Sequence, residues 1–456
     1  MTQVEQKSKL KSSSCDRKLA ELDRNLIVTY YQRGRKNIKL KNYRAAIENF
    51  TAVLNLEPQN TKAYLIRAYS YGEIKEFAHE IADYSQAIAL EPNLPQAYRS
   101  RGYAYALLQQ YPKAIADLNQ AVKLDPTFEQ AYFNLASINR LLRQYHLALA
   151  DYTKVIRLNP QNASAYYYRG YIYQHLEQYR LAISDFSVAI ALDPDRAKAY
   201  GQRGYTYFKL RRYCNAIVDY SQAILLDPQD WQSLYYQGHA YRQLEDYSNA
   251  RMNYSGVIGL KPRLGSVYQD CGYVCGKLKD FEAAIANYTQ AIKYNPQNHL
   301  NYYHRANCHN FLEQYQQAID NYTKCIKLEP NYDRAYFNRA VTYSSLQEYQ
   351  KAIDDYSLAL KAKNQSPVIY NNRGIAYQNL RQYRLAIADY TQAIFFDSNY
   401  ATAYFNRALV HYLLKSYLKC CQDLSQAQNL FQRQGKILLV QKANRAIEQL
   451  IKISNE

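Results

Sequence analysis

One 34-residue stretch decides the fold: residues 163–196, which read ASAYYYRGYIYQHLEQYRLAISDFSVAIALDPDR. The proline near its end, Pro194, recurs at intervals of 34 positions along most of the chain. The series is Pro58, Pro92, Pro126, Pro160, Pro194, Pro228, Pro262, Pro296 and Pro330. A fixed period of this length is typical of a solenoid, in which each repeat is one supersecondary unit that packs on the next.

The series also fixes where the repeats begin and end. Counting back from Pro58 gives twelve repeats of 34 residues, from Ile27 to Gln434. Residues 1–26 form a polar N-terminal segment, whose last part, residues 16–26, is a candidate for a short cap. Residues 435–456 carry apolar side chains at helical spacing, and we expect a C-terminal capping helix there, as solenoids need for solubility. Neither flank reaches the ~50 residues that an independent domain needs.

Each repeat contains two apolar patterns of helical period. Position 4 is Tyr in eleven of the twelve repeats, position 8 is always Gly or Ala, and position 20 is mostly Ala. Small residues let two helix backbones approach closely, and aromatic residues at positions 4, 11, 17 and 24 fill the space around them. The proline at position 32 ends the unit, because it cannot continue a helix and restricts the residue before it. The repeats therefore predict an all-α fold of helix pairs.

This pattern resembles the tetratricopeptide repeat family over residues 27–434. The resemblance implies antiparallel helix pairs stacked into a right-handed α-α superhelix, a solenoid whose first helices line a concave groove. It also implies that positions 2, 5, 6, 9, 12 and 13 of each first helix face that groove.

Composition and motifs argue against several other classes of protein. The net charge of +18 is spread through the repeats, so it attracts acidic partners of many kinds. No apolar run reaches the ~18 residues of a membrane span and no apolar leader follows Met1, so we expect a cytoplasmic protein. Cys271 and Cys275 lie four positions apart, but no further ligand completes a metal site. Without a phosphate-binding loop or a nucleophile motif, we expect no catalytic residue, no metal, no cofactor and no enzyme activity.

Two polar positions recur beside the core. Position 7 is Arg in nine repeats and position 23 is Asp in eight. Repeats 7 and 8 lose both charges together, with Gln237 and Asn253 in one and Cys271 and Asn287 in the other. The arginines could form a ligand-binding row, but the joint loss favours an ion pair between the two helices. We predict that position-7 Arg pairs with position-23 Asp.

The groove positions implied by the resemblance are rich in bases and aromatic rings. They hold ten Lys or Arg against two acids, Glu73 and Asp270. A solvated helix surface would show mixed charge, so the excess favours a groove for acidic partners. The candidate binding residues of these types are Arg99, Arg140, Lys198, Arg242, Tyr168, Tyr205, Phe337 and Phe405.

Asparagine recurs at position 6. This partial row resembles the asparagine ladder of the O-linked N-acetylglucosamine transferase repeats, which holds peptide backbone, although the transferase domain is absent here. An amide offers both a donor and an acceptor, so it can pair with an extended peptide of any sequence. The candidate peptide-binding residues of this type are Asn134, Asn338, Asn371, Asn372 and Asn406.

Two functions remain in competition. The leading hypothesis is a non-enzymatic scaffold or assembly factor that binds an extended, acidic segment of a protein partner in the groove. The alternative is RNA binding, as in the related pentatricopeptide arrays, where basic charge and stacking rings would serve. A period of 34 rather than 35, and a last third of the groove that is nearly uncharged, disfavour nucleic acid. A carboxylate clamp for chaperone C-termini is rejected, since position 5 is never Lys and position 6 is never Arg.

Overall fold

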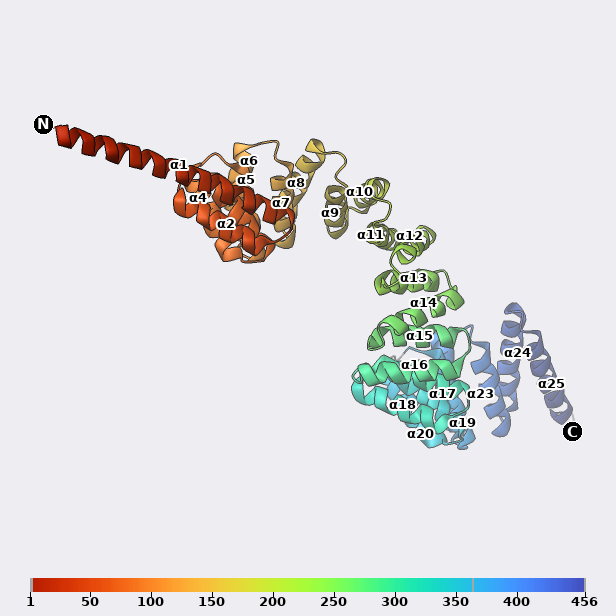
Figure 1. Ribbon diagram of the computed structural model, residues 1–456. Helices are drawn as coiled ribbons and strands as arrows, with labels where there is room; N and C mark the ends of the chain where they lie inside the picture. Colours follow the sequence, from red (N-terminus) through yellow and green to blue (C-terminus); the bar gives the residue numbers. More distant parts are fainter. Residues whose placement is uncertain (1–2, 363–364, 455–456) are drawn as a thin grey trace. The chain divides into compact units, whose positions relative to one another are not determined.

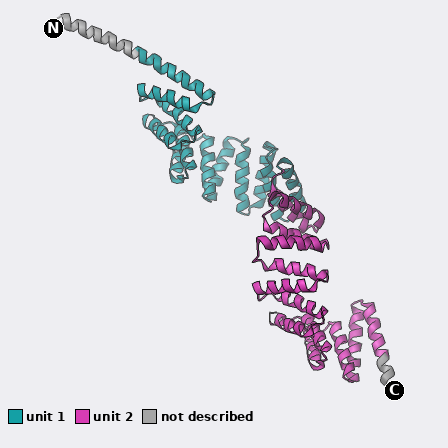
Figure 2. Cartoon of the chain, turned by 60° about the horizontal axis from the view of Figure 1, so that its bottom comes forward, with its two compact units in different colours: residues 1–227 teal, residues 228–456 magenta. Residues whose placement is uncertain are grey.

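The structure, a computed structural model, describes residues 3–362 and 365–454, and that part of the chain contains only helices and their connections (Figure 1). This confirms the predicted all-α solenoid of helix pairs. The chain divides into two compact units, residues 1–227 and residues 228–456 (Figure 2). Among the described residues, no helix is both long and apolar enough to span a bilayer.

Unit 1 contains the first six helix pairs, and from the second pair onward each pair opens at the first residue of a predicted repeat. The helix α1 begins at Gln3, so the first helix of repeat 1 continues into the N-terminal segment. The helices are α1 (Gln3–Lys39), α2 (Tyr43–Leu56), α3 (Thr61–Glu73), α4 (Phe77–Leu90), α5 (Pro95–Leu107), α6 (Tyr111–Leu124), α7 (Glu129–Leu141), α8 (Tyr145–Leu158), α9 (Ala163–His175), α10 (Tyr179–Leu192), α11 (Ala197–Lys209) and α12 (Tyr213–Leu226).

Unit 2 contains the remaining pairs and one further helix. Its helices are α13 (Trp231–Gln243), α14 (Tyr247–Leu260), α15 (Gly265–Lys277), α16 (Phe281–Tyr294), α17 (His299–Phe311), α18 (Tyr315–Leu328), α19 (Asp333–Ser345), α20 (Tyr349–Ala362), α21 (Pro367–Asn379), α22 (Tyr383–Phe396), α23 (Ala401–Leu413), α24 (Tyr417–Arg433) and α25 (Ile437–Ser454). The last of these, α25, packs Val440 against a buried cluster that includes Phe431, and Ile447 against one that includes Leu424, so it covers apolar side chains of the twelfth pair.

The two helices of a pair meet where a small residue faces an aromatic ring. A Cβ atom placed on Gly374 would lie 2.7 Å from a ring carbon of Tyr390, and one on Gly238 would lie 2.8 Å from a ring carbon of Tyr254. Both tyrosines are completely buried. The small residue at position 8 is therefore a steric requirement of the ring at position 24.

Each pair is joined by a turn with one residue in the left-handed region. This residue stands at position 15, with φ between 57° and 62°, and it is always Lys, Arg, Glu or Gln rather than Gly. In repeat 5 the N–H of Gln178 donates to the carbonyl of Tyr173 at 2.9 Å, and the N–H of Glu177 to that of Gln174 at 3.1 Å. These bonds satisfy the last carbonyls of the first helix and fix the direction of the second.

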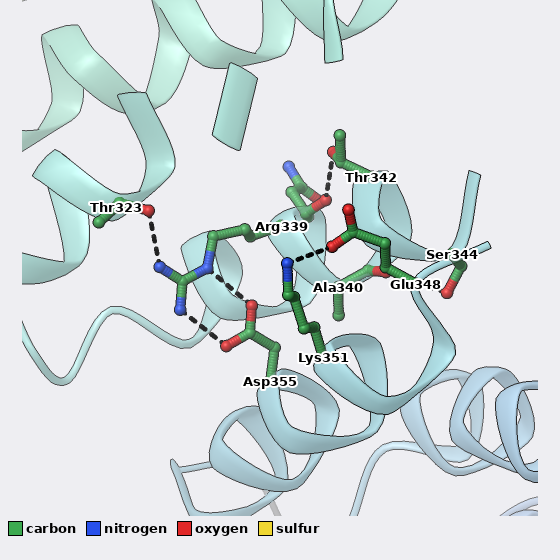
Figure 3. Close-up of polar contacts among 9 residues, drawn as sticks. Thr323, Arg339, Ala340, Thr342, Ser344, Glu348, Lys351 and Asp355 are labelled. Carbon is green, nitrogen blue, oxygen red and sulfur yellow. Dashed lines mark hydrogen bonds and ion pairs between the residues drawn. The ribbon is translucent and has the colours of Figure 1, made fainter. Parts of the chain in front are cut away.

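An arginine ties three helices together in most repeats. In repeat 10, Nε and Nη2 of Arg339 donate to the two carboxylate oxygens of Asp355 at 2.7 Å, and Nη1 donates to Thr323 Oγ1 at 2.8 Å (Figure 3). Thr323 belongs to the second helix of the preceding repeat. The predicted pairing is confirmed in seven repeats, as Arg67–Asp83, Arg101–Asp117, Arg169–Asp185, Arg203–Asp219, Arg339–Asp355, Arg373–Asp389 and Arg407–Asp423.

Repeat 4 departs from this arrangement. Its position 7 is the buried Leu135, so Asp151 at position 23 has no arginine. Asp151 accepts one hydrogen bond from Asn139 Nδ2 at 3.1 Å. Burial raises the pKa of Asp151 to about 6, against the opposing effect of that hydrogen bond.

Candidate functional site

The first helices of repeats 3, 4 and 5 line a partly open pocket of about 240 Å³ in unit 1. Its lining comes from α5, α7 and the start of α9, and includes Arg99, Phe133, Asn134 and Ser164. We call the surface made by positions 2, 5, 6, 9, 12 and 13 of the first helices the first-helix face. Two of the predicted binding residues, Arg99 and Asn134, therefore meet in one pocket on this face.

One contact rule organises the first-helix face within each unit. The residue at position 5 of one repeat touches the residue at position 6 of the next, which lies 35 positions later in the sequence. Such pairs are Phe133 with Tyr168, Tyr235 with Asp270, Tyr303 with Asn338, and Asn371 with Asn406. Arg99 and Asn134 occupy the corresponding positions of repeats 3 and 4.

Arg99 and Asn134 line the same pocket, and both have N–H groups without a close acceptor among the described residues. The guanidinium of Arg99 has no acceptor site, and its hydrogen bond is a long one from Nη2 to Ser100 Oγ at 3.3 Å. Asn134 Nδ2 is buried and has no hydrogen-bond partner. An unsatisfied buried donor costs about 1–3 kcal/mol, so this pocket is short of an acceptor.

Two acids lie near Arg99 without neutralising it through an ion pair. Glu80, buried in α4, feels the charge of Arg99, but burial is the larger effect and raises the pKa of Glu80 to about 7. Glu129 lines the pocket, and its two oxygens accept from Asn159 Nδ2 at 3.1 Å and Asn162 Nδ2 at 2.6 Å. The carboxylate of Glu129 is thus held by amides at the edge of the pocket.

Arg140, one and a half turns beyond Asn134 on α7, is a second cation of this face. Its guanidinium carbon lies 4.8 Å from the ring centroid of Tyr168 and 5.9 Å from that of Tyr171. Arg140 Nε is buried without an acceptor. In the described residues no acid forms an ion pair with it, so Tyr168 supports a cation that keeps at least one donor, Nε, without an acceptor.

The other candidates of unit 1 lie on α11. Lys198 is exposed and forms no ion pair within the described part of the chain. Tyr205 is half-buried, and the ammonium of Lys209 lies 5.4 Å from its ring centroid. These residues therefore present charge and an aromatic surface, without the enclosure that surrounds Arg99.

In unit 2, by contrast, Arg242 is already paired. Arg242 Nη1 donates to Asp270 Oδ1 at 2.6 Å, and Tyr235 OH donates to Asp270 Oδ2 at 2.8 Å. His239 Nε2 lies 3.7 Å from the same oxygen, and burial lowers the pKa of His239. On this part of the first-helix face, Asp270 thus neutralises Arg242.

The asparagine row of unit 2 is also engaged within the protein. Asn338 Nδ2 donates to Asn307 Oδ1 at 2.9 Å and to Tyr303 OH at 3.1 Å. Farther along, Asn406 Nδ2 donates to Asn371 Oδ1 at 2.9 Å, and Asn371 Nδ2 donates to Asn372 Oδ1 at 3.3 Å. The two phenylalanines of the prediction pack inward, Phe337 against Tyr356 and Phe405 against Phe431.

Sequence reasoning missed the role of Asp270, which had been counted only as one of two acids. It also missed Glu80, which stands at position 20, where most repeats carry Ala. An acid in a small-residue slot was a signal that could have been used. The described residues hold no cluster of three His, Cys, Asp or Glu that could bind a metal, and Cys271 and Cys275 are buried thiols.

Comparison with known proteins identifies the repeats. Family models described as tetratricopeptide repeat match residues 27–60, 129–162, 151–184, 197–230, 265–298, 301–332, 333–363 and 367–400, and one described as TPR repeat matches residues 102–139. A search of curated proteins found no match.

Among solved structures, the C-terminal part of a TPR repeat-containing protein from Cytophaga hutchinsonii is 19% identical, covering 53% of this chain and 98% of its own, with a TM-score of 0.47. A chain of the APC/C hetero-tetramer Cut9–Hcn1 is 14% identical, covering 91% of this chain and 96% of its own, with a TM-score of 0.39. YrrB, described as a TPR protein with an unusual peptide-binding site, is 23% identical, covering 41% of this chain and 97% of its own, with a TM-score of 0.38. The matched repeats, together with the tandem helix pairs, show that the chain belongs to the tetratricopeptide repeat family.

Proposed function

We propose that this chain is a non-enzymatic interaction scaffold that binds an extended, acidic segment of a protein partner on the first-helix face of unit 1. Membership of the repeat family supports a binding role. One observation carries the choice of face and of ligand charge: Arg99 and Arg140 have no ion pair in the described residues, whereas seven of the nine position-7 arginines are held by aspartates. The partner supplies the missing acceptors.

The distribution of charge supports the same surface. Seven of the ten bases on the first-helix face lie in unit 1, together with one of the two acids, Glu73. An excess of positive charge speeds the encounter with an acidic segment and fixes its register more than it adds affinity. Binding is therefore expected to weaken with salt.

The test compares two variants of equal net charge. In the first, Arg99→Gln and Arg140→Gln remove the cations of the first-helix face. In the second, Arg180→Gln and Arg212→Gln remove two exposed arginines outside it. Each protein is used to capture partners from a lysate of the cells that produce it, with and without nuclease.

We expect a protein that is retained by the wild type and by the Arg180/Arg212 variant, lost with the Arg99/Arg140 variant, and unaffected by nuclease. Loss of all specific partners on nuclease treatment, with bound RNA recovered instead, would reject the protein-binding proposal in favour of nucleic acid.

A further inference from the structure

We propose that the pocket between α5, α7 and α9 binds one Asp or Glu side chain of the partner, with Arg99 and Asn134 as its two donors. This inference rests on the proposed function and adds a specific anchor to it. A pocket of about 240 Å³ is smaller than the ~300–1,000 Å³ of small-molecule sites, so it suits a single side chain.

The need for a carboxylate follows from the contact between positions 5 and 6. Where this contact is polar in unit 2, one residue donates and the other accepts: Tyr235 donates to Asp270, and Asn338 to Tyr303. Arg99 can only donate, and Asn134, which lines the same pocket, has a buried Nδ2 without a hydrogen-bond partner among the described residues. A carboxylate has two oxygens and offers about four acceptor positions, which is enough for both donors.

Repeats 7 and 8 show the same solution built from the chain itself. The Asp270 carboxylate stands at position 6 and receives one donor on each oxygen, Arg242 Nη1 on Oδ1 and Tyr235 OH on Oδ2. In repeat 4 the position-6 residue is the amide Asn134, and among the described residues no carboxylate is hydrogen-bonded to Arg99 or to Asn134 Nδ2. In the proposed complex the partner's carboxylate accepts from Arg99 and Asn134, as Asp270 accepts from Arg242 and Tyr235 in unit 2.

Glu129 restricts what can accompany that acid. It lines the pocket beside Asn162, and each of its oxygens already accepts from an amide. A second carboxylate at that end would meet a like charge, which is unfavourable in a site partly shielded from water. The pocket therefore selects one acid at one position rather than a run of acids.

The experiment is a selection of random dodecapeptides by display on the full-length protein. Three baits are used in parallel: the wild type, Asn134→Asp, and Asn215→Asp. The first variant places an internal carboxylate beside Arg99, as Asp270 stands beside Arg242. The second makes the same charge change on the exposed face of α12. Thermal unfolding verifies that all three baits are folded, and Arg99→Gln replaces Asn134→Asp if that variant does not fold.

We expect peptides selected on the wild type and on Asn215→Asp to share one Asp or Glu at a fixed position, and Asn134→Asp to lose them. A selected peptide should bind Asn134→Asp roughly tenfold or more weakly. Its Glu→Gln or Asp→Asn form should bind the wild type equally weakly, with no further loss when the two changes are combined.

Selected peptides without a fixed acid, or with the same acid on Asn134→Asp, would overturn this inference and leave the proposed function standing. If no bait selects any peptide, both fail. If a single-stranded RNA of similar length binds the wild type and not Asn134→Asp, while no peptide is selected, the pocket binds phosphate and both proposals are wrong.

Discussion

At position 6, repeat 4 in unit 1 carries Asn134 and repeat 8 in unit 2 carries Asp270, and the two surroundings differ accordingly. Asp270 gathers Arg242 and Tyr235 on its two oxygens. Asn134 leaves its own N–H group unpaired beside Arg99, which can only donate. Both places have the same helix-pair fold, so we infer that a change between amide and acid at position 6 decides whether a cation on this face is bonded within the fold or left for a ligand.

Both units contain the pair between position-7 Arg and position-23 Asp, and its loss should have the largest effect on stability. Asp185→Ala in unit 1 and Asp355→Ala in unit 2 each leave a mostly buried arginine without its carboxylate, and we expect a loss of about 3 kcal/mol in local stability from either. Hydrogen exchange of the affected helix pair measures it. Asp193→Ala is the control, because it breaks a more exposed pair with Arg196 and should cost under about 1 kcal/mol. Losses as small as this control's in both variants would show that the arginine network does not hold the pairs together.

The asparagines of the two units should respond differently to removal. Asn338→Ala removes the two hydrogen bonds that its Nδ2 donates to Asn307 and Tyr303, so we expect a loss of about 1–2 kcal/mol in unit 2. Asn134→Ala removes a buried Nδ2 that has no partner among the described residues, so unit 1 should lose no stability and should gain some from the relief of that unpaired donor. Local hydrogen exchange in α19 and α7 reports both. An equal loss at the two sites would mean that Asn134 is as firmly bonded within the fold as Asn338.

Repeat 4 in unit 1 also has an aspartate at position 23 but no arginine at position 7. No described repeat of unit 2 has this combination. The pKa of Asp151 is about 6 in the fold, above the ~3.9 of an unfolded chain, so the fold favours the protonated acid. The wild type should therefore lose stability as the pH rises from about 4 through 6. Asp151→Asn should remove that slope, so that its stability relative to the wild type rises by about 2 kcal/mol between pH 4.5 and pH 7.5. Parallel pH profiles of the two proteins in thermal unfolding would contradict the assignment.

The smallest expected effect concerns helix α14 in unit 2. Gly256 and Gly259 lie within this helix, and a Cβ on Gly259 would meet no atom within 4 Å. Gly259→Ala should therefore stabilise α14 by about 0.5–1 kcal/mol through the backbone alone. Residues 247–260 should exchange faster in the wild type than residues 213–226 of α12, and the substitution should narrow the difference. Unchanged exchange after the substitution would show that glycine does not limit α14.

Much of the fold could be predicted from the sequence because the repeats of the solenoid use the same residue types at the same positions for the same local contacts. The spacing of the prolines gave the first residue of the first helices from Thr61 onward, and the joint loss of charge in repeats 7 and 8 gave the pairing of Arg169 with Asp185. The third partner of each arginine, such as Thr323 for Arg339, was missed because it lies in the preceding repeat. The extension of α1 to Gln3 falls outside the period altogether.

The site was less predictable for a physical reason. Reading each position by itself made Arg99, Arg140 and Arg242 equivalent, and made Asn134 equivalent to Asn338. Their states depend on side chains of the neighbouring repeat, 28 or 35 positions away, and on whether these can accept: Asp270 accepts from Tyr235 and Arg242, while Asn134 lines a pocket with Arg99. A comparison of positions 5 and 6 in successive repeats would have separated them.

The most direct measurement is hydrogen exchange of the full chain with and without a selected peptide that carries the fixed acid. We expect slower exchange in residues 95–107, 129–141 and 163–175 of unit 1, where the donors lack acceptors, and no change in residues 231–243 and 265–277 of unit 2. Slowing confined to unit 2, or no slowing in the three helices of unit 1 while the peptide is bound, would contradict the claim that the unpaired donors of repeats 3 to 5 form the binding site.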